Sequence, residues 1–297
     1  LLSLLATLAG LHSGDSAYPV GGSLALAQAI ERRFLGLGGE VHYRSRVAEV
    51  LVENGKAVGI RLADGAEHRA DAVISAADGH WTIFEALGGK YADDTIRGYY
   101  EKLPIYEPFL QVSLGVARDM RDVPHTQYIK LGEPITIAGR QQDYFGLRHW
   151  GYDPTLAPAG KSVLAASWLS DYAYWKALRA DRQQYNAEKQ RLAEAVIAQI
   201  DKLYPGISGQ IEVVDVATPV TYERYTGTWQ GSFMAWKQTP QTSYMEKRKT
   251  LPGLGRFYMA GQWVETTGGV CTAAWSGRNV IRALCKEDGK PFEASRP

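Results

Sequence analysis

Three glycines near the C-terminus stand where a chain can bind an anion. Gly261 directly follows an expected strand over 257–260, and Gly268 and Gly269 come just before an expected helix from Val270 to Cys285. A strand that leads through glycines into a helix presents free backbone N–H groups and the positive end of the helix dipole. Glycine also lets the backbone approach a ligand closely. This pattern predicts an anion site at the start of the last helix.

Metal and nucleophile chemistry have little support in the sequence. Cys271 and Cys285 lie on the same expected helix, about 21 Å apart at 1.5 Å per residue, which is too far for a disulfide. We expect both thiols to be reduced, which fits a cytoplasmic protein. The six His show no metal-ligand spacing, so no metal is predicted, and Ser276 stands in no nucleophile elbow. No catalytic residue can be assigned.

Composition excludes several classes of protein. The 297 residues are 45% hydrophobic and 22% charged, as in an average globular chain. Lys and Arg number 33 and Asp and Glu 32, so nothing favours nucleic acid as a partner. The apolar start is shorter than the roughly 20 residues of a membrane span, so we expect an amphipathic or buried helix there. Because Leu1 is not Met, we expect the chain to be the C-terminal portion of a longer protein.

The segment over 15–80 predicts a helix, a strand, a small antiparallel meander and a buried strand. Ser23 is the expected N-cap of the helix, whose apolar face has helical spacing. The face consists of Leu24, Ala27, Ile30 and Phe34. A short strand is expected to open at Val41, another covers 47–52, and Asn54-Gly55 predicts a hairpin turn. The apolar run over 72–76 is typical of a fully buried strand.

The segment over 81–250 has a different character. Strands are expected over 109–116 and 162–168, with a long helix beginning after Asp181. The buried stripe expected on that helix consists of Leu192, Val196, Ile200 and Leu203. Most of the Trp and Tyr residues fall in this segment, which favours an apolar cleft for an elongated hydrophobic ligand.

Several motifs resemble the phytoene desaturase family, which consists of FAD-dependent oxidoreductases with an amine-oxidase-like architecture. The N-terminal match comprises Pro19-x-Gly21-Gly22 before a helix, Arg46-Val47, and Ala70-Asp71-x-Val73-Ile74-Ser75. The C-terminal match comprises Phe257 to Gly261, Gly268-Gly269-Val270 and Ser276-Gly277. Two departures stand out. The chain has no Gly-x-Gly-x-x-Gly after a strand, since the glycines at positions 36, 38 and 39 follow an expected helix. In addition, Gln262 stands where the family often has an acidic residue.

The resemblance implies an α/β fold with an α+β part: an incomplete FAD-binding domain with helix, strands and β-meander, plus a mixed-sheet substrate domain. The implied division is 1–14 as a helix of the substrate domain, 15–80 as part of the FAD-binding domain, 81–250 as the substrate domain, 251–290 as the closing part of the FAD-binding domain, and 291–297 as a tail. The implied cofactor-binding residues are Gly21, Gly22, Val47, Gly261, Gln262, Thr267, Gly268, Gly269 and Val270.

The implied activity is dehydrogenation or desaturation of an apolar, isoprenoid-like substrate by hydride transfer to the flavin. Three alternatives stay open: an amine or porphyrinogen oxidase-like flavoenzyme, an inactive C-terminal fragment, and a module that binds a hydrophobic ligand or a membrane surface. Without the glycine fingerprint, we expect this chain to hold FAD weakly or not at all. A cytoplasmic location is expected, with peripheral membrane contact left open, and the oligomeric state is not assigned.

Overall fold

The computed structural model describes residues 2–14, 17–243, 245, 247–265 and 269–294. The helices are α1 (Leu2–Ser13), α2 (Gly22–Gly36), α3 (Asp94–Lys102), α4 (Tyr172–Leu178), α5 (Arg182–Leu203), α6 (Pro219–Thr226), α7 (Pro240–Ser243) and α8 (Val270–Glu287), with single turns η1 (Trp81–Ala86), η2 (Ser208–Gln210), η3 (Trp229–Gly231) and η4 (Gln262–Val264). The strands are β1 (Val47–Glu53), β2 (Lys56–Leu62), β3 (Glu67–Arg69), β4 (Val73–Ser75), β5 (Phe109–Val116), β6 (Thr126–Ile137), β7 (Arg140–His149), β8 (Ser162–Leu169), β9 (Ile211–Ala217) and β10 (Phe257–Met259).

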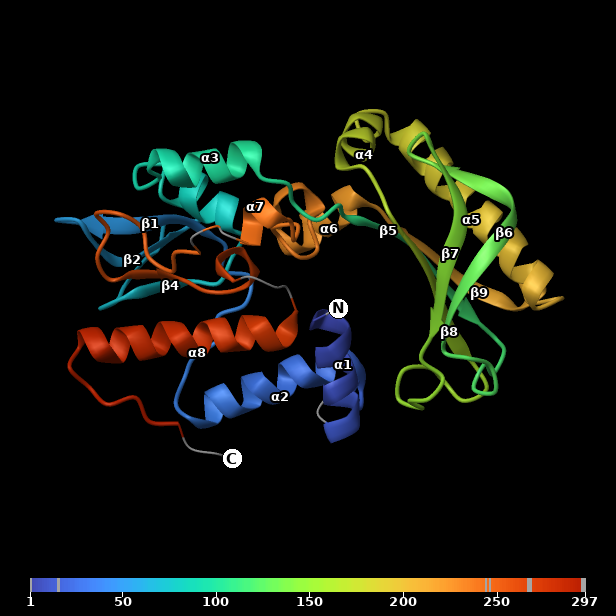
Figure 1. Cartoon of the computed structure of the whole chain (residues 1–297), viewed down its shortest axis with the longest axis horizontal. Helices are drawn as coiled ribbons and strands as arrows, with labels where there is room; N and C mark the ends of the chain where they lie inside the picture. Colours follow the sequence, from blue (N-terminus) through green and yellow to red (C-terminus); the bar gives the residue numbers. More distant parts are fainter. Residues whose placement is uncertain (1, 15–16, 244, 246, 266–268, 295–297) are drawn as a thin grey trace.

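The molecule has two parts, which lie side by side in Figure 1. In one part, β1, β2 and β4 lie between α3 and α8, with α2 on the far side of α8; in the other, a larger sheet carries α4 and α5. The expected α/β fold with an α+β part is therefore confirmed, since a parallel strand pair with helices adjoins a separate antiparallel sheet.

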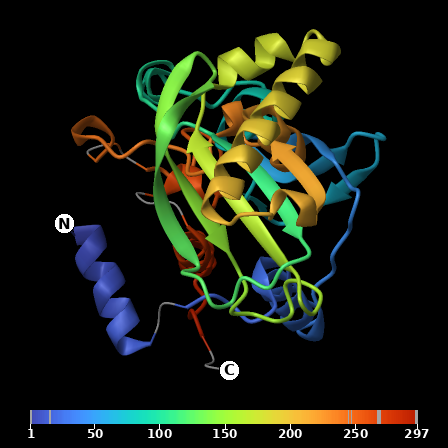
Figure 2. The ribbon, with the colours of Figure 1, turned by 90° about the vertical axis from the view of Figure 1, so that its right-hand side faces the viewer.

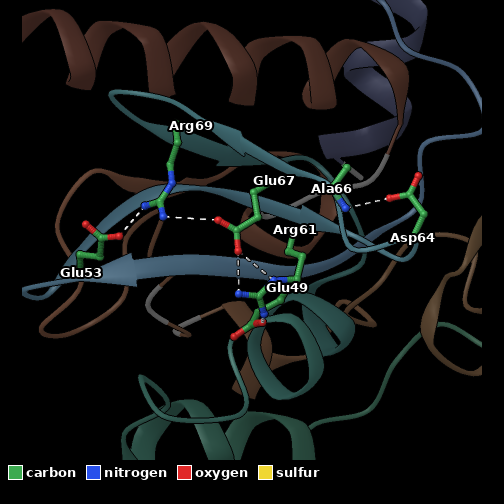
Figure 3. Close-up of polar contacts among 7 residues, drawn as sticks. All are labelled: Glu49, Glu53, Arg61, Asp64, Ala66, Glu67 and Arg69. Carbon is green, nitrogen blue, oxygen red and sulfur yellow. Dashed lines mark hydrogen bonds and ion pairs between the residues drawn. The ribbon is translucent and has the colours of Figure 1, made fainter.

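The meander is the antiparallel sheet β1-β2-β3. The Asn54-Gly55 turn predicted from sequence is present, with both residues at positive φ and Glu53 paired with Lys56. On its solvent face, Figure 3 shows Arg61 between Glu49 and Glu67, and Arg69 reaching Glu53. Exposed ion pairs of this kind contribute little each, but alternating charges across the strands favour this register.

The meander is tied directly to the C-terminal segment. The backbone N–H of Gly255 donates to the carbonyl of Gly55 at 2.8 Å, and the N–H of Ala57 donates back to Gly255 at 2.9 Å. Two residues further on, β10 begins and pairs in parallel with β4, from Phe257 opposite Val73 to Met259 opposite Ser75. The segments over 47–75 and 255–259 thus fold into one unit.

Helix α8 covers the β10-β4 pair. Its Val280 is buried against Tyr258 and Ala260, with Ala72 and Leu284 packed at the edge of this cluster. The strand β4 is only partly buried. Among the described strands it pairs with β10 alone, and its Ile74 is 40% exposed. The prediction of a fully buried strand over 72–76 was therefore wrong.

The second part is an antiparallel sheet in the order β6-β7-β8-β5-β9. The strands β5 and β8 and the helix α5 lie where the sequence placed them, and Asp181 caps α5 by accepting from the amides of Gln183 and Gln184. Leu192, Val196 and Ile200 are buried against the sheet, whereas Leu203, expected in the same stripe, is exposed. Alternating side chains of β5 fill the other side of this core.

Two predictions at the N-terminal end were wrong. The N-cap of α2 is Gly21, which has φ 82° and no side chain to cap with, rather than Ser23. No strand forms at Val41, which lies in irregular structure. The expected apolar face of α2 exists, but it is not buried in this chain: Leu24, Ile30 and Phe34 are all exposed.

Helix α1 confirms that the apolar start of the chain is helical. Its Leu5, Leu8 and Leu11 are exposed, and Figure 2 shows the helix standing away from the rest of the molecule. Among the helices that the structure describes, none combines the length and hydropathy that a membrane span requires.

Candidate functional site

A cavity of about 990 Å³ lies where the meander, the carboxyl end of β4 and the end of α6 meet. Val47, at the start of β1, lines it together with Ala76, which directly follows β4. Asp78, His80 and Trp229 line it as well. Residues from β1 to η1 form most of its wall, and the segment over 223–229 forms the rest, so the cavity depends on the N-terminal unit folding against the end of α6 and the loop after it. Ligands of open parallel sheets bind at the carboxyl ends of the strands, and this cavity has that position relative to β4.

Asp78 is the buried acid of the cavity. Its Oδ1 accepts from the backbone N–H of Trp81 at 2.9 Å, and its Oδ2 accepts from the N–H of Trp229 at 2.8 Å. Burial raises the pKa of Asp78, although these hydrogen bonds favour the charged form and act against the shift. The carboxylate holds the η3 loop against the end of β4.

An aromatic cluster stands next to this acid. The imidazole of His80 stacks on the indole of Trp229 with ring centroids 4.7 Å apart and an interplanar angle of 7°. Tyr100 meets both rings edge-on, at 5.6 Å and 5.5 Å. Burial, with a smaller contribution from Asp78, raises the pKa of Tyr100, so this phenol stays neutral. The cluster gives one end of the cavity a flat, apolar wall with an ionisable ring in it.

Gly261 connects the cavity to the start of α8. It lies at φ 97°, a conformation that favours glycine, and its N–H donates to the buried hydroxyl of Ser276 at 2.8 Å. A side chain added at Gly261 would begin 3.9 Å from the carbonyl oxygen of Ala76, which lines the cavity. Gln262 follows directly and opens η4.

The start of α8 has the features expected of an anion site. Its N-cap is Gly269, at φ 115°, a residue that has no side chain of its own to cap the helix. A side chain added at Gly269 would meet nothing within 4 Å, and Val270 is exposed. Thr267 and Gly268, which belong to the predicted set, lie outside the described residues.

The structure separates Gly21 and Gly22 from the other predicted site residues. Their turn does not line the cavity; it contacts the loop that follows β7, where Asp153 accepts from the N–H of Gly21 at 2.8 Å. Of the predicted set, Val47 lines the cavity and Gly261 adjoins it.

Sequence reasoning missed Asp78, His80 and Trp229. The available signal was the position of Asp78-Gly79-His80 directly after a strand that was correctly predicted. Polar groups at the carboxyl end of a parallel strand are candidates for ligand contact. Within the described residues, no group of three or more His, Cys, Asp or Glu side chains could hold a metal ion.

A family model described as flavin containing amine oxidoreductase matches residues 8–285. The chain belongs to this family. The predicted membership of the phytoene desaturase-like, amine-oxidase-like flavoproteins is thereby confirmed, and the family description supports a flavin as the cofactor.

Curated relatives point in the same direction. A chloroplastic prolycopene isomerase of Daucus carota is 28% identical over 270 residues, which are 90% of this chain and 43% of the relative. A neurosporene-forming phytoene desaturase of Cereibacter sphaeroides is 28% identical over 284 residues, covering 91% of this chain and 53% of the relative. The chain therefore spans about half the length of the curated relatives it matches.

Solved structures show the same fold. An engineered putrescine oxidase matches 90% of this chain and 53% of its own length, with a TM-score of 0.60 and 12% identity. An oxidoreductase from Methanosarcina mazei matches 89% of this chain and 55% of its own length, with a TM-score of 0.57 and 20% identity. At these identities the likeness concerns the fold alone.

Proposed function

We propose that this chain supplies the closing part of an FAD site and the substrate domain of an oxidoreductase that dehydrogenates an apolar, isoprenoid-like substrate. The cavity between Val47, the carboxyl end of β4 and the His80–Trp229 stack carries this proposal. Family membership supports the flavin, and the names of the relatives, which concern carotenoids and their precursors, support the substrate class.

The described residues fit a flavin nucleotide. Val47 offers backbone at the mouth of the cavity, and Gly261 leaves room beside the carbonyl of Ala76. The glycine N-cap of α8 at Gly269, followed by the exposed Val270, suits a phosphate group. We propose that these residues hold FAD, together with Gln262, Thr267 and Gly268, and with Gly21 and Gly22 near its ring. When bound, FAD supplies the hydride-accepting chemistry.

The chain's own residues would bind and orient the substrate. The wall formed by His80, Trp229 and Trp81 offers aromatic surface that an extended polyene can lie against. Correct orientation of a C–H bond accounts for much of the rate in such a site. The imidazole of His80, stacked on Trp229, is part of this wall and lies beside the space in which the substrate would be held.

A turnover comparison tests the proposed function. The purified chain is incubated with excess FAD and, in separate arms, with phytoene in detergent, with putrescine and with protoporphyrinogen. New long-wavelength polyene absorption that depends on FAD and appears only in the phytoene arm is the expected result. Oxidation of the amine or the porphyrinogen instead would contradict the substrate class. Bound flavin with no turnover in any arm would contradict dehydrogenation by this chain and would favour the alternative of an inactive fragment.

A further inference from the structure

The turn at Gly21–Gly22 is fastened to the second part of the molecule by a single carboxylate. The N–H of Gly21 donates to Oδ2 of Asp153 at 2.8 Å, across 132 residues of sequence. Within the turn, the N–H of Gly22 donates to the carbonyl of Pro19 at 3.0 Å. The turn is therefore closed internally and is also bonded from outside through the Gly21 amide, directly before α2 begins.

The other oxygen of Asp153 organises its own loop. Oδ1 accepts from the N–H of Thr155 at 2.9 Å and from its hydroxyl at 2.6 Å. The backbone around it is also fixed, since Asp153 donates to the carbonyl of Trp150 at 3.0 Å and accepts from Leu156 at 3.2 Å. Asp153 is buried, and both of its oxygens are used.

Hydrogen bonding keeps Asp153 ionised. The hydroxyl of Thr155, then its backbone N–H, and then the N–H of Gly21 hold the pKa of Asp153 below its ordinary value. A charged acceptor makes a stronger hydrogen bond than a neutral one. The carboxylate is thus a suitable anchor for the Gly21 amide at neutral pH.

The two loops also fit each other in shape. The rings of Tyr18 and Tyr152 lie 5.9 Å apart. A Cβ added at Gly22 would stand 3.0 Å from Cδ2 of Leu156, a contact tighter than side chains normally make. Gly22 also lies at φ 75°, a backbone conformation that favours glycine.

We propose that Asp153 is a positioning residue, which fixes the conformation of the Gly21–Gly22 turn, a predicted cofactor contact, from the substrate domain. The proposal rests on the proposed function, because the turn itself is a predicted cofactor contact. Sequence motifs assigned the glycines, but the anchor lies far from them in the chain, and no motif connects the two.

Hydrogen exchange read by mass spectrometry tests the anchor without any cofactor. A peptide over 17–24 is compared in the wild-type chain, Asp153→Ala, Asp153→Asn and Asp143→Ala, the last removing an exposed carboxylate on β7 for which no partner is seen. We expect exchange at the Gly21 amide to rise about tenfold in Asp153→Ala, to rise less in Asp153→Asn, which keeps one oxygen, and to stay at the wild-type rate in the control. Unchanged exchange in Asp153→Ala, with the remaining peptides also unchanged, would overturn the proposal.

Flavin titration then tests what the anchor is for. The fluorescence of added FAD is followed in the same four proteins, and we expect weaker binding in Asp153→Ala, partial recovery in Asp153→Asn and wild-type binding in Asp143→Ala. Faster exchange combined with wild-type flavin affinity would overturn the positioning role. A wild-type chain that binds no flavin would instead contradict the proposed function, and with it the role toward the cofactor, while the exchange data still decide whether the anchor exists.

Discussion

The carboxylate of Asp78 accepts a hydrogen bond from the backbone N–H of Trp229 at 2.8 Å, across 151 residues of sequence. Asp78 follows β4, whereas Trp229 begins η3 after α6, so one buried group joins two segments that are far apart in the sequence at the cavity. The same contact places the indole of Trp229 parallel to His80.

Replacement of Asp78 by Asn should change how stability depends on pH. Burial raises the pKa of Asp78 in the folded chain above its ordinary value of 3.8. The folded state therefore binds the proton more tightly than the unfolded state. The stability that the chain gains from this tighter proton binding is fully present below pH 3.8 and is lost as the pH rises through the folded pKa of Asp78. In Asp78→Asn, which has no proton to lose, this decline should be absent.

Urea unfolding at a series of pH values from 3.5 upward measures this effect, with Asp143→Asn as an exposed control expected to follow the wild type. Asp78→Ala should be less stable than Asp78→Asn, because it leaves the amides of both Trp81 and Trp229 without their acceptor. Identical pH profiles for the wild type and Asp78→Asn would disprove the raised pKa.

Gly59 should tolerate no side chain. It lies at φ 154°, and a Cβ there would stand 2.1 Å from the carbonyl oxygen of His68 on the paired strand. Gly59→Ala should therefore disrupt the β2-β3 pairing and lower the free energy of unfolding by more than about 2 kcal/mol.

Gly65→Ala provides the matched control. Gly65 also has positive φ, at 91°, but a Cβ there meets nothing within 4 Å, so only the backbone conformation is penalised, by about 1 kcal/mol. Denaturant unfolding compares the two. Equal losses would show that the approach of β3 to β2 is looser than described.

The two thiols on α8 should both be titratable in the native chain. Neither forms a disulfide, and Cys271 is exposed whereas Cys285 is half-buried. Ellman's reagent should therefore modify Cys271 first and Cys285 more slowly, with a total of two thiols in denaturant. A total below two without prior reduction would contradict the description.

Local sequence patterns were sufficient to predict an element where its capping residue or its turn residues lie next to it in the chain. Asp181 with the stripe at Leu192, Val196 and Ile200 predicted α5, and Asn54-Gly55 predicted the first hairpin. The apolar spacing of α2 predicted a helix correctly but not its burial, since periodicity reveals an apolar face without revealing what packs on it.

The candidate site was only partly predictable for a related reason. Motifs located Val47 and Gly261 because each lies in a short recognisable pattern. Asp78 and Trp229 meet only through the tertiary fold. The position of Asp78 after a strand was a signal for a site residue, but nothing in the sequence connects it with Trp229.

Binding of FAD most directly tests whether the cavity holds a flavin. Because Ala76 lines the cavity, a larger side chain at this position would fill it. The wild-type chain should quench the fluorescence of added FAD weakly but saturably. Ala76→Trp, which places an indole in the cavity, should abolish this quenching, and Ala187→Trp, on an exposed position of α5, should leave it unchanged. No saturable quenching by the wild type, or equal quenching by the wild type and Ala76→Trp, would contradict the assignment of this cavity to a flavin.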